Sequence, residues 1–200
     1  MQGKGAAEAR SLAPLPIRAH PLVLGVVLFL ASELMFFAAL FAAFYDIRAN
    51  HAVWPPAGVH LDIGEPSYGT FLLFVASLVM VFATRAMDKR RIRAARWYTT
   101  SAIIAAVGFC LLSVHGYLRY AADGLTLATS AYGSLLYTLT GFHLLHVIVG
   151  VGVLFALLVA MRSPAVTANN RAAAEAMTYY WHFVFIVWIG IYTTVFIVGK

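Results

Sequence analysis

The 200-residue chain has few charged residues and only one cysteine. Asp, Glu, Lys and Arg make up 11% of the chain, whereas 62% of its residues are hydrophobic. A soluble domain carries about a quarter charged residues, because its water-facing surface needs them. The scarcity of charge therefore excludes a soluble globule. The lone Cys110 excludes a disulfide framework and a metal site built from cysteines.

Several catalytic signatures are also missing from the sequence. It has no glycine-rich phosphate loop, no Cys-x-x-Cys pair, no nucleophile elbow and no two adjacent carboxylates. It also has no two adjacent histidines, so the residues for a binuclear haem–copper centre are missing. If the chain belongs to a redox enzyme, we expect the redox centres on other subunits.

Long apolar runs are what the sequence has in abundance. A bilayer core about 30 Å thick needs roughly 20 helical residues at 1.5 Å per residue. Five runs meet this length and predict an all-α, polytopic membrane bundle: 22–45, 67–87, 97–121, 134–161 and 176–198. Residues 1–21 are predicted to be a cytoplasmic tail, in which Pro14, Pro16 and Pro21 oppose helix formation. Residues 22–200 then form a single transmembrane domain.

The basic residues indicate how the predicted helices are oriented. Cytoplasmic loops of membrane proteins are enriched in Lys and Arg. With the N-terminus inside, all of the 14 basic residues except Arg48, Arg119 and Lys200 lie on the cytoplasmic side, most densely between Arg85 and Arg96. We therefore expect a cytoplasmic N-terminus and an external C-terminus. Because the positive charge is spread over loops, we expect no nucleic-acid partner.

Polar side chains at membrane depth are costly and mark candidate sites. Glu33 lies near the middle of the first predicted helix, so its carboxyl group is expected to be protonated or paired. His146 is expected at a similar depth on the fourth helix, and the two can meet if these helices pack together. Two interpretations of Glu33 stay open: a hydrogen bond that joins two helices, or a role in proton movement or lipid contact.

Other histidines and several tryptophans complete the set of candidates. His143 is three residues before His146 and is expected to share its face of the helix, although metal or haem binding by such a pair is a weak expectation. His182 lies near the cytoplasmic start of the fifth helix. Amphipathic rings favour the headgroup level of a membrane, so three residues are predicted to be interfacial: Trp54, Trp97 and Trp181.

Small residues on two helices predict close packing in lipid, where packing drives helix association. They are Gly141, Gly150 and Gly152 on the fourth predicted helix and Ala38, Ala39, Ala42 and Ala43 on the first.

Four motifs, in order along nearly the whole chain, resemble subunit III of the haem–copper oxidases. They are Ser32–Phe37 with Phe41 and Tyr45, Trp54-Pro55-Pro56 with Gly58, a set of residues between Gly133 and Val147, and Tyr180–Phe183 with Trp188. The number of predicted helices matches the short, five-helix form of this family. The chain departs from the family at Leu118 and Phe185, where acidic residues are usual.

The resemblance implies a subunit without redox centres in a proton-pumping terminal oxidase of a bacterial plasma membrane. Haems and copper would lie on the partners, subunits I and II, so this chain would hold no metal or cofactor and no catalytic residue. The family has a cleft that holds phospholipid, which implies bound phospholipid here, with Glu33 as the buried carboxyl at the cleft. His143, His146 and His182 would bridge helices or lie near lipid.

Other functions are consistent with parts of the sequence. The two departures allow a quinol oxidase subunit or an accessory protein of nitric oxide reductase. Intramembrane histidines are typical of diheme cytochromes, but His143 and His146 lie on one helix rather than on facing helices. Glu33 would suit a small transporter, but the predicted spans contain no repeat and no proline that breaks a helix.

Overall fold

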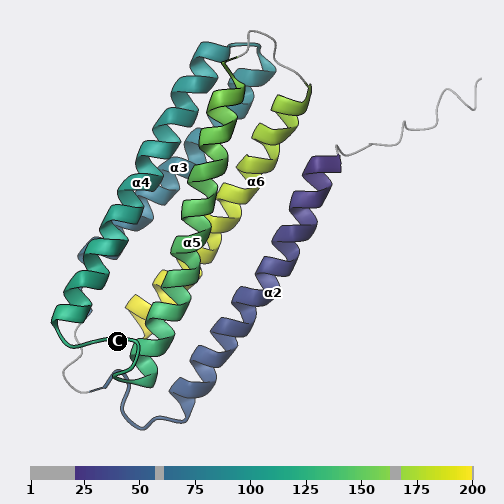
Figure 1. Ribbon diagram of the computed structural model, residues 1–200. Helices are drawn as coiled ribbons and strands as arrows, with labels where there is room; N and C mark the ends of the chain where they lie inside the picture. The colour runs from purple at the N-terminus through teal and green to yellow at the C-terminus, as the bar shows by residue number, and fades with distance from the viewer. Residues whose placement is uncertain (1–20, 57–60, 163–167, 200) are drawn as a thin grey trace, which may run out of the picture.

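The computed structural model describes residues 21–56, 61–162 and 168–199. Over these ranges the chain is helical, without strands (Figure 1). Its elements are α2 (Pro21–Ala49), α3 (Gly64–Asp88), α4 (Ile92–Ala122), α5 (Ala131–Ala160), α6 (Ala168–Ile191) and a π-helix, η1 (Tyr192–Val198), that continues α6. Within the described part, 5 helical segments are long and apolar enough to cross a membrane, which confirms the predicted fold class. Gly58, the residues before Pro21 and Lys200 lie outside these ranges.

The helices begin earlier than the apolar runs predict. Pro21 is the first residue of α2 rather than part of a tail, because a residue at this position needs no backbone N–H. Pro66 likewise falls in the first turn of α3, although the predicted spans were free of proline. α4 begins at Ile92, so Arg93 and Arg96 are helical. An apolar run marks the lipid-facing length of a helix, whereas its ends continue into the polar boundary.

A three-residue turn connects α3 to α4, and an eight-residue loop connects α4 to α5. Arg90 has a φ of 55° and follows α3. The backbone N–H of Arg91 donates to the Ala86 carbonyl at 2.8 Å, which closes a Schellman motif at the helix end. After α4, Gly124 takes the same left-handed conformation, with a φ of 82°. Such short connections place consecutive helices side by side and antiparallel.

Helices α3 to α6 pack into a bundle, and α2 lies along one side of it against α6 and α5 (Figure 1). The core of the bundle contains large, fully buried side chains such as Trp181, Tyr132 and Phe109. By contrast, α2 buries only Phe37 and Phe44. Its other residues are partly or fully exposed, so most of its surface is available to lipid or to a partner.

The prediction of small-residue packing holds for one glycine of α5 only. A Cβ atom on Gly150 would lie 2.9 Å from the Tyr180 ring and 3.1 Å from the Trp181 ring, so α5 and α6 approach closely here. Gly141 and Gly152 have nothing within 4 Å at the same position. The four alanines of α2 are exposed. Their prediction was wrong because α2 packs on the bundle through phenylalanines, one of which, Phe41, lies against Gly190 of α6.

Candidate functional site

Glu33 of α2 and His146 of α5 form a direct contact between the two helices. Glu33 Oε2 lies 2.9 Å from His146 Nε2, and the side chains are 20% and 14% exposed. The expectation that the two residues meet is therefore confirmed. The contact is the main polar link between α2 and the rest of the bundle near the middle of α2.

The hydrogen bond made by the other ring nitrogen of His146, Nδ1, limits the protonation states that are open to the Glu33–His146 pair. His146 Nδ1 lies 2.7 Å from the Phe142 carbonyl oxygen, which can only accept, so Nδ1 carries a proton. A single further proton then lies between Nε2 and Glu33. The pair is either a carboxylic acid with a neutral imidazole or a carboxylate with an imidazolium, and its net charge is zero in both forms. This arrangement satisfies the requirement for a protonated or paired carboxyl at this depth.

Aromatic rings surround this pair. The Phe37 ring lies 5.2 Å from the His146 ring, and Phe36 and Phe142 form an edge-to-face contact at 5.0 Å between centroids. Tyr180 of α6 donates a hydrogen bond to the His146 carbonyl at 2.7 Å. An apolar surrounding strengthens the hydrogen bond between Glu33 and His146, because little water competes for it.

The His143 ring contacts α4 and α6, whereas the His146 ring contacts α2. The His143 side chain is buried, and its ring packs against Phe109 of α4 at 5.7 Å and Trp188 of α6 at 5.0 Å. Neither ring nitrogen has a hydrogen-bond partner among the described residues. The spacing of three residues thus does not bring the two histidines to a common partner. Nor does any group of three His, Cys, Asp or Glu side chains suited to a metal ion occur in the described ranges.

His182 of α6 is joined to α3. Its Nδ1 lies 2.7 Å from the hydroxyl oxygen of Ser77. The two residues line a hollow whose other walls are apolar, and these include Phe185, at the place where the family usually has an acid. The structure therefore puts His182 apart from Glu33 and His146, on the opposite side of α6, facing α3.

The three tryptophans predicted to be interfacial have different surroundings. Trp97 is 74% exposed, as an interfacial residue needs to be. Trp54 is half-buried and packs edge-to-face against Phe44 and Tyr132, with centroids 5.5 and 5.0 Å away. Trp181 is fully buried. The prediction that Trp181 is an interfacial anchor was wrong, because its ring packs inside the bundle against Gly150, where a Cβ atom would lie 3.1 Å from it.

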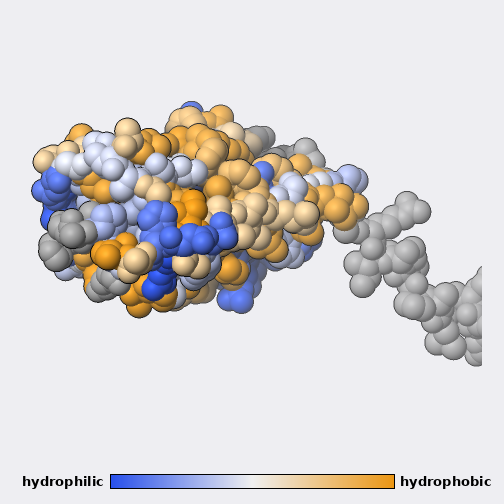
Figure 2. All heavy atoms as spheres, turned by 90° about the horizontal axis from the view of Figure 1, so that it is seen from below, coloured by the Kyte–Doolittle hydropathy of each residue, from blue (hydrophilic) through white to orange (hydrophobic). Residues whose placement is uncertain are grey.

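A second polar cluster, which contains none of the candidate residues above, lies at the end of the bundle where α3 begins and α4 ends. Glu65 Oε1 lies 2.6 Å from an Arg119 nitrogen and 3.0 Å from His115 Nδ1. Asp62 also contacts Arg119, at 3.4 Å. Hydrogen bonding from the Gly64 N–H, and the nearby Arg119 guanidinium, lower the pKa of the Asp62 carboxyl. Figure 2 looks onto this end and shows patches of hydrophilic residues with hydrophobic ones around them.

The sequence contains a signal for this cluster. His115 and Arg119 lie four residues apart on one helix, and therefore on one face. Glu65 lies in the first turn of α3, where a carboxylate is favoured by the helix dipole. Because a hairpin of two helices puts the start of one beside the end of the other, α3 and α4 bring these residues together.

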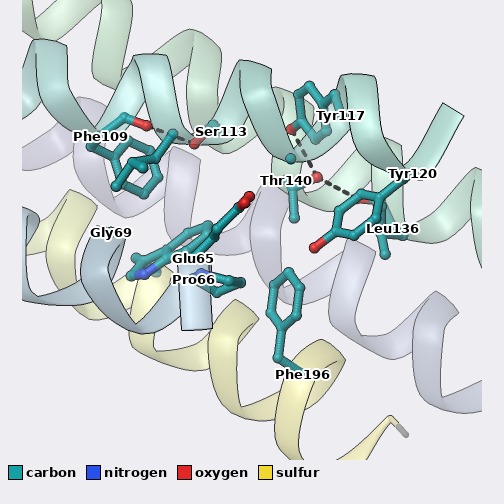
Figure 3. A pocket seen from close by; sticks show the side chains of 13 residues that line it. Glu65, Pro66, Gly69, Phe109, Ser113, Tyr117, Tyr120, Leu136, Thr140 and Phe196 are labelled. Carbon is teal, nitrogen blue, oxygen red and sulfur yellow. Dashed lines mark hydrogen bonds between the residues drawn. The ribbon is translucent and has the colours of Figure 1, made fainter. Parts of the chain in front are cut away.

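A small cavity lies beside Glu65, with Tyr117, Tyr120 and Thr140 around it (Figure 3). Tyr117 donates a hydrogen bond to the Thr140 hydroxyl at 2.9 Å. The cavity volume is about 40 Å³. This is enough for water molecules and too small for a lipid or an organic cofactor.

The chain is similar to known proteins over most of its length. Residues 16–200 match the family model described as cytochrome c oxidase subunit III. The chain is 33% identical over 204 residues to cytochrome c oxidase subunit 3 of Thermostichus vulcanus, a match that covers 100% of both chains. It is 36% identical to probable cytochrome c oxidase subunit 3 of Nocardia farcinica, with 90% of each chain covered. It is 31% identical to cytochrome c oxidase subunit 3 of Bacillus subtilis, a match that covers 88% of this chain and 86% of the relative.

Proposed function

The chain belongs to the cytochrome c oxidase subunit III family, and on this premise we propose that it is a non-catalytic subunit of a proton-pumping terminal oxidase. The similarity to proteins of this name supports a multi-pass membrane subunit of a haem–copper oxidase complex. In the proposed complex the chain docks on subunit I, with subunit II as a further partner. Haem and copper are held by these partners. Because the named relatives come from bacteria, we place the complex in a bacterial plasma membrane.

The Glu33–His146 pair is the observation that supports a specific role for this chain in the proposed complex. The two facing atoms, Glu33 Oε2 and His146 Nε2, lie 2.9 Å apart, and a hydrogen bond between them needs one proton. The proton can move from one to the other without changing the net charge, so the step needs no counter-ion in lipid. We propose that the pair supports proton delivery to the catalytic subunit during sustained turnover.

The surface beside this pair is suited to lipid. Phe36 of α2 and Phe142 of α5 are 37% and 40% exposed and pack against each other next to Glu33. Apolar rings beside a partly exposed carboxyl–imidazole pair provide contacts for an acyl chain. We propose that phospholipid lies along α2 here and keeps bulk water away from the pair.

Purification of the tagged chain in mild detergent tests the proposal. We expect subunits I and II, with the haem and copper of the complex, to purify with it, and the complex to take up oxygen when reduced cytochrome c is supplied. Mass identification of a quinol oxidase or a nitric oxide reductase core would assign the chain to those complexes instead. A Soret band in the chain separated from its partners would contradict the proposal that it holds no haem.

A further inference from the structure

A basic hollow lies on the surface between α4 and the end of α5. Its lining comprises Arg93, Arg96, Trp97, Thr100, Leu158 and Arg162. All three arginines are exposed. The hollow lies at the end of the bundle where α2 begins and where α3 turns into α4, opposite the Glu65 end (Figure 1).

Among the residues that the structure describes, the three arginines of the hollow have no acidic partner. Elsewhere in the described chain, Arg119 contacts Glu65 at 2.6 Å and Arg171 contacts Asp88 at 2.6 Å. No described carboxylate lies within 4.0 Å of the guanidinium groups of the hollow. Three like charges that line one hollow repel each other, and a bound anion relieves this repulsion. Guanidinium groups bind phosphate with two parallel hydrogen bonds, which makes them suited to this anion.

The surroundings of the hollow point to a lipid rather than a soluble anion. Trp97, at its edge, is 74% exposed, and tryptophan favours the headgroup level of a membrane. Ile104 and Leu111 of α4 are 67% and 68% exposed and continue the face of Trp97 along the helix. On α5, Phe155 is 58% exposed and lies one turn from Leu158. An apolar seam therefore runs from the hollow along both helices.

We propose that this hollow binds the phosphate of an anionic phospholipid, with the arginines around the headgroup and the acyl chains along the seam between α4 and α5. Basic pockets between helices at a membrane surface have the charge and position that such headgroups require. The site is separate from the Glu33–His146 pair and does not depend on a role in an oxidase. It depends only on the chain spanning a membrane.

Native mass spectrometry of the full-length chain in detergent tests this site. The chain is mixed with phosphatidylglycerol or, separately, with phosphatidylcholine of the same acyl chains. The test variant is Arg93→Gln/Arg96→Gln/Arg162→Gln. The matched control is Lys89→Gln/Arg90→Gln/Arg91→Gln, which removes the same charge at the same end but outside the hollow. We expect preferential binding of phosphatidylglycerol, a loss of roughly a hundredfold in the test variant, and at most a few-fold loss in the control.

Three results would overturn the proposal. Equal loss of phosphatidylglycerol in both variants would show that overall charge, not the hollow, holds the lipid. Equal binding of phosphatidylcholine by the unmodified chain would show that the headgroup is not recognised. Displacement of phosphatidylglycerol by millimolar inorganic phosphate would identify a soluble anion as the ligand.

Discussion

In the described part of the chain, two glutamate–histidine pairs lie in very different surroundings. Glu33 and His146 meet near the middle of two helices, among aromatic rings, with side chains 20% and 14% exposed. Glu65 and His115 meet at a helix end, where the histidine side chain is 62% exposed. Arg119 also contacts Glu65, at 2.6 Å, whereas among the described residues Glu33 has no arginine partner.

The comparison shows that the neighbours of a carboxyl decide what it can do. Arg119 keeps its charge at any physiological pH, so it holds Glu65 as a carboxylate in a static ion pair. His146 can take or release a proton, so its pair with Glu33 can hold that proton at either end. The pair at the helix end is suited to joining α3 to α4. The pair near the middle of the helices is suited to handling a proton.

The largest loss of stability is expected from a substitution in α5, one turn after His146 of the Glu33–His146 pair. Gly150→Val places a side chain against the Tyr180 and Trp181 rings, which are buried and cannot move away freely. We expect the free energy of unfolding in detergent to fall by roughly 3 kcal/mol. Gly152→Val, two residues along α5, meets nothing within 4 Å and is the matched control. The unfolding of both variants can be followed by the reaction of Cys110 with a maleimide, because this half-buried thiol is the only one in the chain. Equal loss in the two variants would contradict the packing described here.

The same substitution in both pairs compares them directly. His146→Leu leaves the Glu33 carboxyl without a partner in an apolar surrounding, and we expect it to cost about 2 kcal/mol of unfolding free energy. His115→Leu leaves Arg119 in contact with Glu65 at an exposed site, and we expect a change within about 0.5 kcal/mol. Thermal unfolding followed by circular dichroism measures both variants. A larger loss of unfolding free energy in His115→Leu than in His146→Leu would contradict the expectation that the Glu33–His146 pair contributes more to stability.

The smallest effect is expected from charge removal at the helix end. Glu65→Gln removes the carboxylate that contacts Arg119, so the unfolding temperature falls slightly at low salt. Solvent-exposed charges are screened as salt rises, and we expect the difference from the unmodified chain to shrink between 0.01 and 1 M salt. Glu33→Gln is the control, because an amide can still donate to His146 Nε2 and that site is shielded from ions. If Glu65→Gln lowered the unfolding temperature equally at all salt concentrations, the contact between Glu65 and Arg119 would not be a solvent-screened ion pair.

Much of the fold could be predicted from the sequence because lipid imposes a simple rule. A helix must cross about 30 Å of hydrocarbon, so long apolar runs reveal it. The helix ends could not be placed in this way, because arginines such as Arg93 continue a helix into the polar boundary. The orientation remains a prediction from the distribution of Lys and Arg.

The site was only partly predictable. Glu33 and His146 could be linked because both are polar and lie at similar depth. The surroundings of Trp181 and His143 depend on side-chain packing between helices, which no local pattern specifies. Gly150 and Gly152 illustrate this, since they are identical in type and on one helix, yet only Gly150 faces a neighbour.

The proposed role of Glu33 is to carry an exchangeable proton and not only to link α2 to α5. The most direct measurement is the decay of oxygen uptake during sustained turnover, in complexes with Glu33→Gln, Glu33→Ala or the unmodified chain. Glu33→Gln keeps a hydrogen bond to His146 but has no acidic proton. We predict that it assembles normally and loses activity several-fold faster than the unmodified complex, as Glu33→Ala does. Decay of the Glu33→Gln complex at the unmodified rate would contradict the claim.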